Sequence, residues 1–350
     1  MTDWDRVRHL DVRIDDYALE RLEQDVSSDF TRVTTVIRMT GGGEEGIGED
    51  VVYDAEDQDA ALEAGPVLPL TGQWTIEGLS NHLAGLDLFP GKEPVREVGR
   101  LYRRYAYESA ALDLALRQAG TSLHEVVGRE PRPLTYVVSL RLGEPPALDP
   151  VTRRMANYPS LRFKLDPTAS WTDELVAGLA ATGAIDSVDF KGHYKGTIVD
   201  NPPDVALYRS VVEGLPDAWI EDPHLDDAVQ EYLVAHRDRI TWDAPIHGIA
   251  DIEALPFAPK MVNVKPSRVG SLKELFATYA YCDERGIGMY GGGQFELGPG
   301  RGQIQLLASL YHPDTPNDVS PAGFHVADPP PGIPESPLPP QAHERGFRWG

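Results

Sequence analysis

From about residue 133 onward, short apolar segments alternate with stretches of helical pattern, and this alternation constrains the fold more than any other feature of the chain. Strands that are separated by helices pair in parallel. Eight strand-helix repeats favour a closed (β/α) barrel over an open doubly wound sheet. We therefore predict an α/β fold with a modified TIM barrel over residues 133–326. The expected strands are 135–142, 160–165, 184–190, 218–222, 240–245, 261–266, 286–292 and 318–325, with helices at 173–183, 204–215, 226–239 and 271–286 between several of them.

The first 132 residues have a different pattern. Residues 9–53 contain β-branched, alternating segments around a glycine-rich turn, and residues 93–128 have helical periodicity with Gly120 as a stop signal. We predict an α+β domain here. Residues 327–350 are rich in proline, and we expect them to form an extended tail on the surface.

Composition excludes several classes of protein. Hydrophobic residues make up 41% of the 350 residues and charged residues 25%, which is globular usage. The formal net charge of −23 argues against binding to nucleic acid or to anionic lipid. The single cysteine, Cys282, excludes an internal disulfide framework. There is no signal-peptide pattern, and no apolar run approaches the ~18 residues that span a bilayer, so we expect a cytoplasmic protein.

Charged residues follow five successive barrel strands. They are Lys164, Asp189, Glu221, Asp243 and Lys265, with steps of 25, 32, 22 and 22 residues, each of which fits one βα unit. Catalytic groups of such barrels lie at the carboxyl ends of the strands. Any one of these residues could be an ordinary loop charge, but their order and spacing favour a common site.

The three carboxylates of this set, Asp189, Glu221 and Asp243, would repel one another unless a cation lay between them. Oxygen ligands with room for water suit Mg²⁺ better than Zn²⁺. Lys164 and Lys265 would flank the carboxylates on opposite sides of the barrel mouth. Two bases and a metal ion form a site for removing a proton next to a carboxylate.

Several segments, in this order, resemble the enolase superfamily in its mandelate racemase and muconate-lactonizing branch. VIRMTGGGEEGIGED resembles the capping domain of that family, and YESAALDLALRQAGTSLHEVVG resembles the helix that leads into its barrel. FKLD, VDFKGHY, WIEDP, ITWDAPI, VNVKPSRVGSL and GGGQFELGPGRGQIQLLAS resemble its successive barrel motifs. The resemblance covers nearly the whole chain.

The resemblance implies a capped barrel in which Asp189, Glu221 and Asp243 bind Mg²⁺ and in which Lys164 and Lys265 are the bases that form and quench an enediolate. A lysine on each side is the pattern of cycloisomerases, o-succinylbenzoate synthases, N-acylamino acid racemases and dipeptide epimerases. It implies a small-molecule carboxylate substrate and leaves racemisation, cycloisomerisation and elimination open. Homo-oligomers are common in the family.

Three residues depart from the family pattern. Arg162 stands where a lysine is usual, and it would keep a positive charge near Lys164 without being a base. Lys191 stands where asparagine is common, and it shares a face with Asp189 because residues i and i+2 of a strand do so. Ala244 stands where an acidic residue is common, which would leave Asp243 with fewer outer partners.

We predict four residues that bind substrate, namely Arg162, Lys191, Gln294 and Glu296. Lys191 could contact a substrate carboxylate, act as a further base, or pair with Asp222 or Glu296. Gln294 and Glu296 could instead belong to a glycine-rich turn with a helix cap. Asp318 is followed by Ser320 where dipeptide epimerases have a second aspartate, which counts against dipeptide substrates.

Two alternatives to the leading function remain. One is an acid-sugar dehydratase of the same superfamily, with Lys191 as an extra acid, and the other is a catalytically silent barrel that binds metal. The acidic charge is concentrated in residues 1–65, which carry 18 Asp+Glu and 6 Arg. We therefore hypothesise that residues 15–29 and the stretch after Asp50 form an acidic lid over the barrel mouth, which disfavours substrates with additional negative charge away from the metal.

Overall fold

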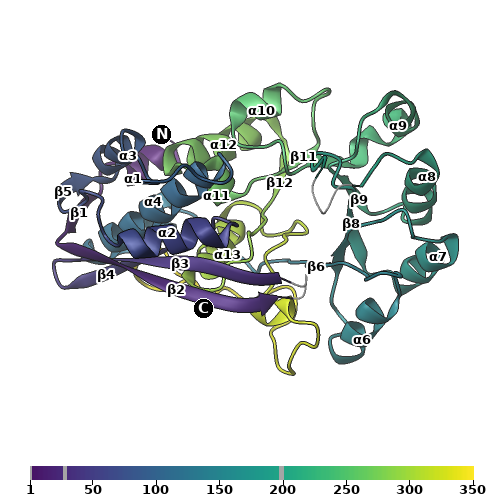
Figure 1. Cartoon of the computed structure of the whole chain (residues 1–350), viewed down its shortest axis with the longest axis horizontal. Helices are drawn as coiled ribbons and strands as arrows, with labels where there is room; N and C mark the ends of the chain where they lie inside the picture. Colours follow the sequence, from purple (N-terminus) through teal and green to yellow (C-terminus); the bar gives the residue numbers. More distant parts are fainter. Residues whose placement is uncertain (1, 27–29, 197–200) are drawn as a thin grey trace.

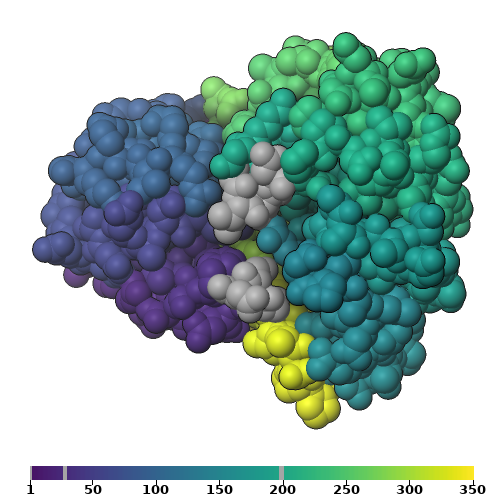
Figure 2. Space-filling model, turned by 45° about the vertical axis from the view of Figure 1, so that its right-hand side comes forward, coloured from purple at the N-terminus to yellow at the C-terminus, as the bar shows by residue number. Residues whose placement is uncertain are grey.

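The computed structural model describes residues 2–26, 30–196 and 201–350. These residues form an N-terminal part with antiparallel strands and a second part built on a seven-stranded parallel sheet (Figure 1). Figure 2 shows the two parts side by side, with residues from the C-terminal region, in yellow, at the lower edge between them. One continuous cluster of buried apolar side chains runs through both parts. None of the helices described is long and apolar enough to cross a membrane.

The N-terminal part is an α+β unit. Its central sheet has the order β2-β3-β4, and a second antiparallel pair joins β1 and β5. The elements are α1 (Asp3–Val7), β1 (Asp11–Ile14), β2 (Asp16–Val26), β3 (Phe30–Gly41), β4 (Glu44–Asp50), α2 (Ala55–Ala64), β5 (Gly72–Thr75), α3 (Ile76–Ala84), α4 (Gly99–Gln118) and α5 (Leu123–Val127).

Helix α4 packs directly on β4, and two glycines allow this contact. A Cβ atom on Gly46 or Gly48 would overlap the backbone of α4 at Ala110 or Ala106. The helix ends where the sequence predicts, because Gly120 has a φ of 71° and the next N–H closes the helix by donating to the carbonyl of Leu116 at 3.0 Å.

The hairpin of β2 and β3 points toward the barrel (Figure 1). At that end the ring of Phe30 packs edge-on against Phe295 of the barrel, with 5.7 Å between centroids. Asp15 and Asp16 lie at the opposite end, where Asp15 accepts a hydrogen bond from Arg13 at 2.7 Å. The acidic residues at the start of the hypothesised lid therefore do not cover the barrel mouth. Residues 27–29 of that segment lie outside the described residues.

The parallel sheet has the order β6 to β12, and each strand pairs with the next. Seven of the expected strands form within the predicted ranges: β6 (Val138–Leu140), β7 (Phe163–Leu165), β8 (Ile185–Asp189), β9 (Trp219–Glu221), β10 (Ile240–Trp242), β11 (Met261–Asn263) and β12 (Gly288–Tyr290). The helices are α6 (Asp149–Asn157), α7 (Asp173–Thr182), α8 (Val205–Gly214), α9 (Asp227–Leu233), η1 (Val234–Arg239), α10 (Ile249–Glu253), α11 (Pro266–Val269), α12 (Leu272–Arg285), α13 (Pro299–Tyr311) and η2 (Ala322–His325).

The predicted eighth strand does not form as a regular strand. Two residues occupy its position instead: Asn317 bridges Tyr136, next to β6, and Asp318 bridges Gly292, next to β12. These bridges connect the two edges of the sheet and close the barrel. The segment leaves the sheet soon afterwards because Pro321 has no N–H to donate to a ladder, and a short 3₁₀ turn, η2, follows.

The C-terminal residues 327–350 have no helix or strand, as expected, but they are more than a surface tail. Leu338, Phe347 and Trp349 are buried. Leu338 exchanges backbone hydrogen bonds with Leu134 at the entrance to the barrel, and Arg348 forms an ion pair with buried Asp113 of α4 at 2.8 Å. The tail therefore connects the barrel to the N-terminal part.

Glu49 of β4 provides a second connection between the two parts. Its carboxylate accepts N–H groups from Leu297 at 2.7 Å, Gly298 at 3.0 Å and Gly300 at 2.9 Å, at the start of α13. These are amides that a helix leaves without internal partners, and Glu49 is buried. Burial, together with the nearby Glu296, raises the pKa of Glu49.

We predict that Glu49→Ala lowers the free energy of unfolding by on the order of 3 kcal/mol, because three buried amides lose a charged acceptor. Urea denaturation of the purified variant measures this change. The exposed Glu231→Ala is the control and should leave stability unchanged. Equal stability of the two variants would show that Glu49 does not hold the start of α13.

Candidate active site

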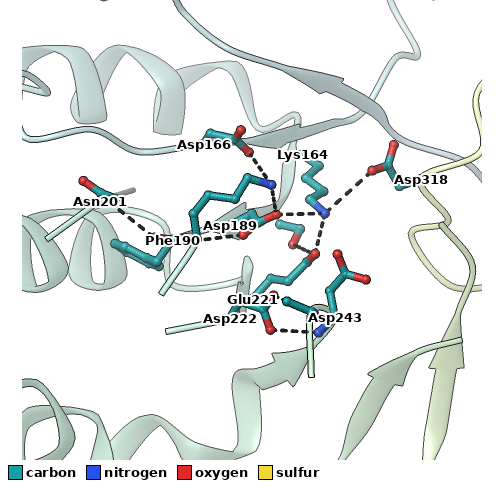
Figure 3. A network of polar contacts seen from close by, with 12 residues as sticks. Lys164, Asp166, Asp189, Phe190, Asn201, Glu221, Asp222, Asp243 and Asp318 are labelled. Atoms are coloured by element: carbon teal, nitrogen blue, oxygen red, sulfur yellow. Dashed lines mark hydrogen bonds and ion pairs between the residues drawn. The ribbon is translucent and has the colours of Figure 1, made fainter. Parts of the chain in front are cut away.

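Five charged side chains meet at the carboxyl end of the parallel sheet, as the sequence predicts. Figure 3 shows four of them, Lys164, Asp189, Glu221 and Asp243. Lys164 comes from β7, Asp189 ends β8 and Glu221 ends β9. Asp243 follows β10, and Lys265 follows β11. The register pairs Asp189 with Glu221 on neighbouring strands, which places their carboxylates side by side.

The carboxylates of Asp189, Glu221 and Asp243 form a buried acidic triad. Each offers one oxygen, and these oxygens lie within 4.8 Å of one another. All three residues are at most 1% exposed. Three buried carboxylates at this separation need compensating positive charge. Oxygen donors from three separate strands fit a hard divalent cation.

Lys164 contacts the triad from the β7 side. Its Nζ donates a short hydrogen bond to Glu221 and lies 3.1 Å from Asp189 and 3.6 Å from Asp318. Burial opposes the ammonium charge, but Glu221 and Asp189 outweigh burial and raise the pKa of Lys164. The lysine therefore acts as a counter-ion within the acidic cluster.

Lys265 contacts the triad from the other side. Its Nζ lies 2.9 Å from Asp243, and its side chain is buried. Here burial dominates and lowers the pKa of Lys265; Asp243 opposes this effect, while Arg268 adds to it. The two lysines thus differ in environment although both are buried.

Asp243 has more outer partners than the sequence suggests. Arg268, on the short helix α11, donates to both its carboxylate and its carbonyl at 2.6 Å. Asp222 accepts the N–H groups of Asp243 and Ala244, each at 2.8 Å. These contacts replace the acidic residue expected at position 244. Burial, followed by Asp243 and Asp189, raises the pKa of Asp222 to about 7.

Lys191 contacts the triad, but its ion-pair partners differ from the two that we predicted, Asp222 and Glu296. Its backbone has a φ of 55°, and both its N–H and its Nζ donate to Asp189. Its second partner is Asp166, at 3.5 Å, in place of Asp222 or Glu296. Burial opposes the charge of Lys191, but Asp166 and Asp189 raise its pKa. Burial likewise opposes ionisation of Asp189, but Lys191 and Lys164 lower its pKa to about 2.

The other three residues predicted to bind substrate lie outside the triad. The Arg162 side chain turns away, donates to Asp186 at 2.7 Å and to the carbonyl of Gly183 at 2.9 Å, and is 42% exposed. Gln294 and Glu296 are buried after β12. Gln294 donates to the Tyr102 hydroxyl at 3.1 Å.

Glu296 has contacts typical of a turn. It accepts the N–H of Gln294 at 2.7 Å and forms an ion pair with Arg301 at 3.0 Å. Gln294, which contacts Tyr102 of α4, lies where the two parts of the molecule meet, and Glu296 holds the turn before α13. Arg162 has contacts that stabilise the sheet.

Two residues of this cluster, Asp166 and Arg268, were not predicted, and Asp222 was considered only as a partner of Lys191. The position of Asp166 could have been predicted, because it lies two residues after Lys164 and so on the same face of the strand. Asp222 adopts a φ of 45°, which turns its carboxylate toward the backbone after β10, and no residue pattern predicts that conformation.

Two family models together match most of the chain. One, described as "Domain of unknown function (DUF8230) C-terminal domain", matches residues 130–326, and the corresponding N-terminal domain matches residues 5–126. Among curated relatives, the N-succinylamino acid racemase of Thermus thermophilus is 26% identical over 91% of this chain and 86% of its own. The o-succinylbenzoate synthase of Bacillus subtilis is 27% identical over 64% of this chain and 61% of its own.

Solved structures show the same fold. A member of the enolase superfamily from Listeria innocua superposes with a TM-score of 0.65 at 18% identity, over 89% of this chain and 86% of the other. The muconate cycloisomerase of Pseudomonas fluorescens superposes with a TM-score of 0.63 at 20% identity, over 97% and 95%. The chain belongs to the family described as DUF8230, and it has the fold of the enolase-superfamily structures to which it is similar.

Proposed function

We propose that the protein is a Mg²⁺-dependent isomerase or lyase that removes the α-proton of a small carboxylate substrate, with Lys164 and Lys265 as its two bases. One observation carries this proposal: a buried acidic triad lies between two buried lysines that approach from different strands. The fold that the chain shares with enolase-superfamily structures, and its similarity to a racemase and a synthase, support the same chemistry.

Asp189, Glu221 and Asp243 would hold the cation. Mg²⁺, when bound there, would stabilise the negative charge that develops on the substrate carboxylate as the α-proton leaves. The donor set fits Mg²⁺ because it contains only carboxylate oxygens from separate strands. Lys164 contacts two of these ligands and Lys265 the third, so a substrate carboxylate at the cation would place its α-carbon near both amines.

Lys164 and Lys265 approach the triad from β7 and from the end of β11, which are four strands apart in the sheet order. In a racemisation, one amine would remove the proton and the other would deliver a proton to the opposite face. In an elimination or a cycloisomerisation, one amine would exchange the proton and the other would stabilise charge. Asp189 and Asp166 hold Lys191 close to this reaction centre.

The printed functions of the relatives indicate which substrates to test first. The Thermus thermophilus relative is named as an N-succinylamino acid racemase and the Bacillus subtilis relative as an o-succinylbenzoate synthase. Both names refer to a succinylated carboxylate, as the compound that the racemase converts and as the product that the synthase forms. We therefore propose N-acylamino acids and succinylated carboxylates ahead of dipeptides and acid sugars.

We predict that Asp189→Asn, Glu221→Gln and Asp243→Asn each weaken Mg²⁺ binding by at least about tenfold, since even the loss of an outer partner of a metal ligand has an effect of this size. Isothermal titration calorimetry with MgCl₂ measures the affinity directly. Asp217→Asn, which changes an exposed carboxylate near β9, is the matched control. Parent-like affinity in all three triad variants would place the metal site elsewhere.

We predict that the parent protein with Mg²⁺ incorporates deuterium from D₂O at the α-carbon of an N-acylamino acid. Lys164→Ala and Lys265→Ala should each lower incorporation into one enantiomer by about 10²–10⁴-fold, the usual contribution of a general base. Proton NMR of each enantiomer follows the loss of the α-proton signal. Lys273→Ala, on the exposed face of α12, should behave as the parent does.

Two outcomes would contradict this assignment. If Mg²⁺ binds to the triad but no N-acylamino acid, dipeptide or acid sugar exchanges its α-proton, the barrel binds metal without this chemistry. If exchange persists in the double variant of Lys164 and Lys265, another group is the base.

A further inference from the structure

Three consecutive glycines, Gly291, Gly292 and Gly293, follow strand β12. None of the three has a φ in the left-handed region, so residues with side chains could adopt the same backbone conformation. The backbone conformation therefore does not require glycine at these three positions. The close approach of neighbouring atoms does.

Each glycine faces a different neighbour. A Cβ atom on Gly291 would lie 2.9 Å from the ring of His312, and one on Gly293 would meet the flexible end of Glu296. A Cβ atom on Gly292 would overlap Cε of Lys265 and would lie 2.8 Å from Nδ2 of Asn263. Gly292 is thus the glycine that touches the proposed catalytic machinery.

The sheet register explains why Gly292 meets Lys265. Strands β11 and β12 are parallel, with Asn263 opposite Tyr290. Two residues further along each chain, Lys265 lies opposite Gly292. The arm of Lys265 lies against the backbone of Gly292, with its Cε atom where a side chain of that residue would begin, while its amine contacts Asp243 on the β10 side.

The backbone on the Gly292 side of this contact is held more firmly than the lysine arm. Gly292 bridges Asp318, and the flanking backbone bonds run from Asp318 N–H to Gly291 at 2.8 Å and from Gly293 N–H to Asp318 at 3.1 Å. On the other side, Lys265 is buried and its amine is paired with Asp243 at 2.9 Å. An added methyl group would displace the lysine arm before it displaced the barrel closure.

Asn263 forms the other wall of this passage. It is fully buried, and among the residues that the structure describes neither of its amide atoms has a hydrogen-bond partner. Its Nδ2 atom lies 2.8 Å from the place of a Cβ atom on Gly292, the same place that Cε of Lys265 approaches. The passage is bounded by Asn263 on β11 and by the backbone of Gly292 after β12.

We infer that Gly292 is a positioning residue for Lys265: its missing side chain leaves the passage that directs the Lys265 amine to one face of the substrate. This inference rests on the proposed function, in which Lys164 and Lys265 serve opposite faces. It separates Gly292 from the glycines on either side, which meet His312 and Glu296 and not a lysine.

The test is the Gly292→Ala variant of the full-length protein with Mg²⁺, using both enantiomers of an N-acylamino acid that the parent exchanges in D₂O. Exchange of the enantiomer that Lys265→Ala impairs should fall by about 10²-fold, the cost of displacing a catalytic group by about 1 Å. Exchange of the other enantiomer, which depends on Lys164, should continue at close to the parent rate.

Gly248→Ala is the matched control, because no atom lies within 4 Å of a Cβ atom there, and it should leave both rates unchanged. Equal losses for the two enantiomers of Gly292→Ala, or no loss, would overturn the inference. A parent protein that exchanges neither enantiomer would instead contradict the proposed function.

A second variant covers the case in which Gly292→Ala does not fold. Asn263→Ala removes the opposite wall of the passage and should lower exchange of the same enantiomer, by a smaller factor. A loss confined to the enantiomer served by Lys164 would overturn the inference. A crystal structure of Gly292→Ala, in which the 2.9 Å contact between Lys265 and Asp243 should be broken, tests the geometry without any substrate, and an intact contact would contradict it.

Discussion

The repulsion among three buried carboxylates is the constraint on which the rest of the site depends. Asp189, Glu221 and Asp243 are held close together by three neighbouring strands, where water cannot screen their charges. The site balances them with cationic side chains: Lys164 and Lys191 contact Asp189, Lys164 also contacts Glu221, and Lys265 and Arg268 contact Asp243. A divalent cation would release these ammonium groups from part of their role as counter-ions and would leave two of them available as bases.

The strands of the barrel fix the positions of the site residues, and Gly292 leaves room for a long side chain among them. Parallel pairing brings each strand end to the same edge of the sheet, so every site residue is set by the backbone of its own strand. The lysine arms are long and must be directed by their surroundings. Gly292 leaves room for the arm of Lys265, and Asn317 and Asp318 close the barrel without a regular strand. Glu49 and the buried C-terminal residues Phe347 and Trp349 connect the N-terminal part to this frame.

The sequence predicts the fold and the central residues because both depend on periodicity. Seven strands form within their expected ranges, and the spacing of Lys164, Asp189, Glu221, Asp243 and Lys265 corresponds to one βα unit per step. The prediction of an eighth strand was wrong, because two bridges are enough to close the barrel and Pro321 ends the segment that forms them. The roles of Asp222 and Arg268 could not be predicted, because they depend on a left-handed φ and on the direction of a short helix. The Arg162 side chain turns toward Asp186. The alternation of inward and outward residues along one strand does not predict this pairing.

A structure determined from crystals soaked in Mn²⁺, with anomalous diffraction data, tests the central claim most directly, because Mn²⁺ takes the oxygen ligands that suit Mg²⁺. The account predicts one anomalous peak between Asp189, Glu221 and Asp243, with an oxygen of each at about 2.0–2.2 Å from the ion, and with the Lys164 amine moved away from Glu221. A triad without an anomalous peak, in which Lys164 still contacts Glu221 and Lys265 still contacts Asp243, would contradict it.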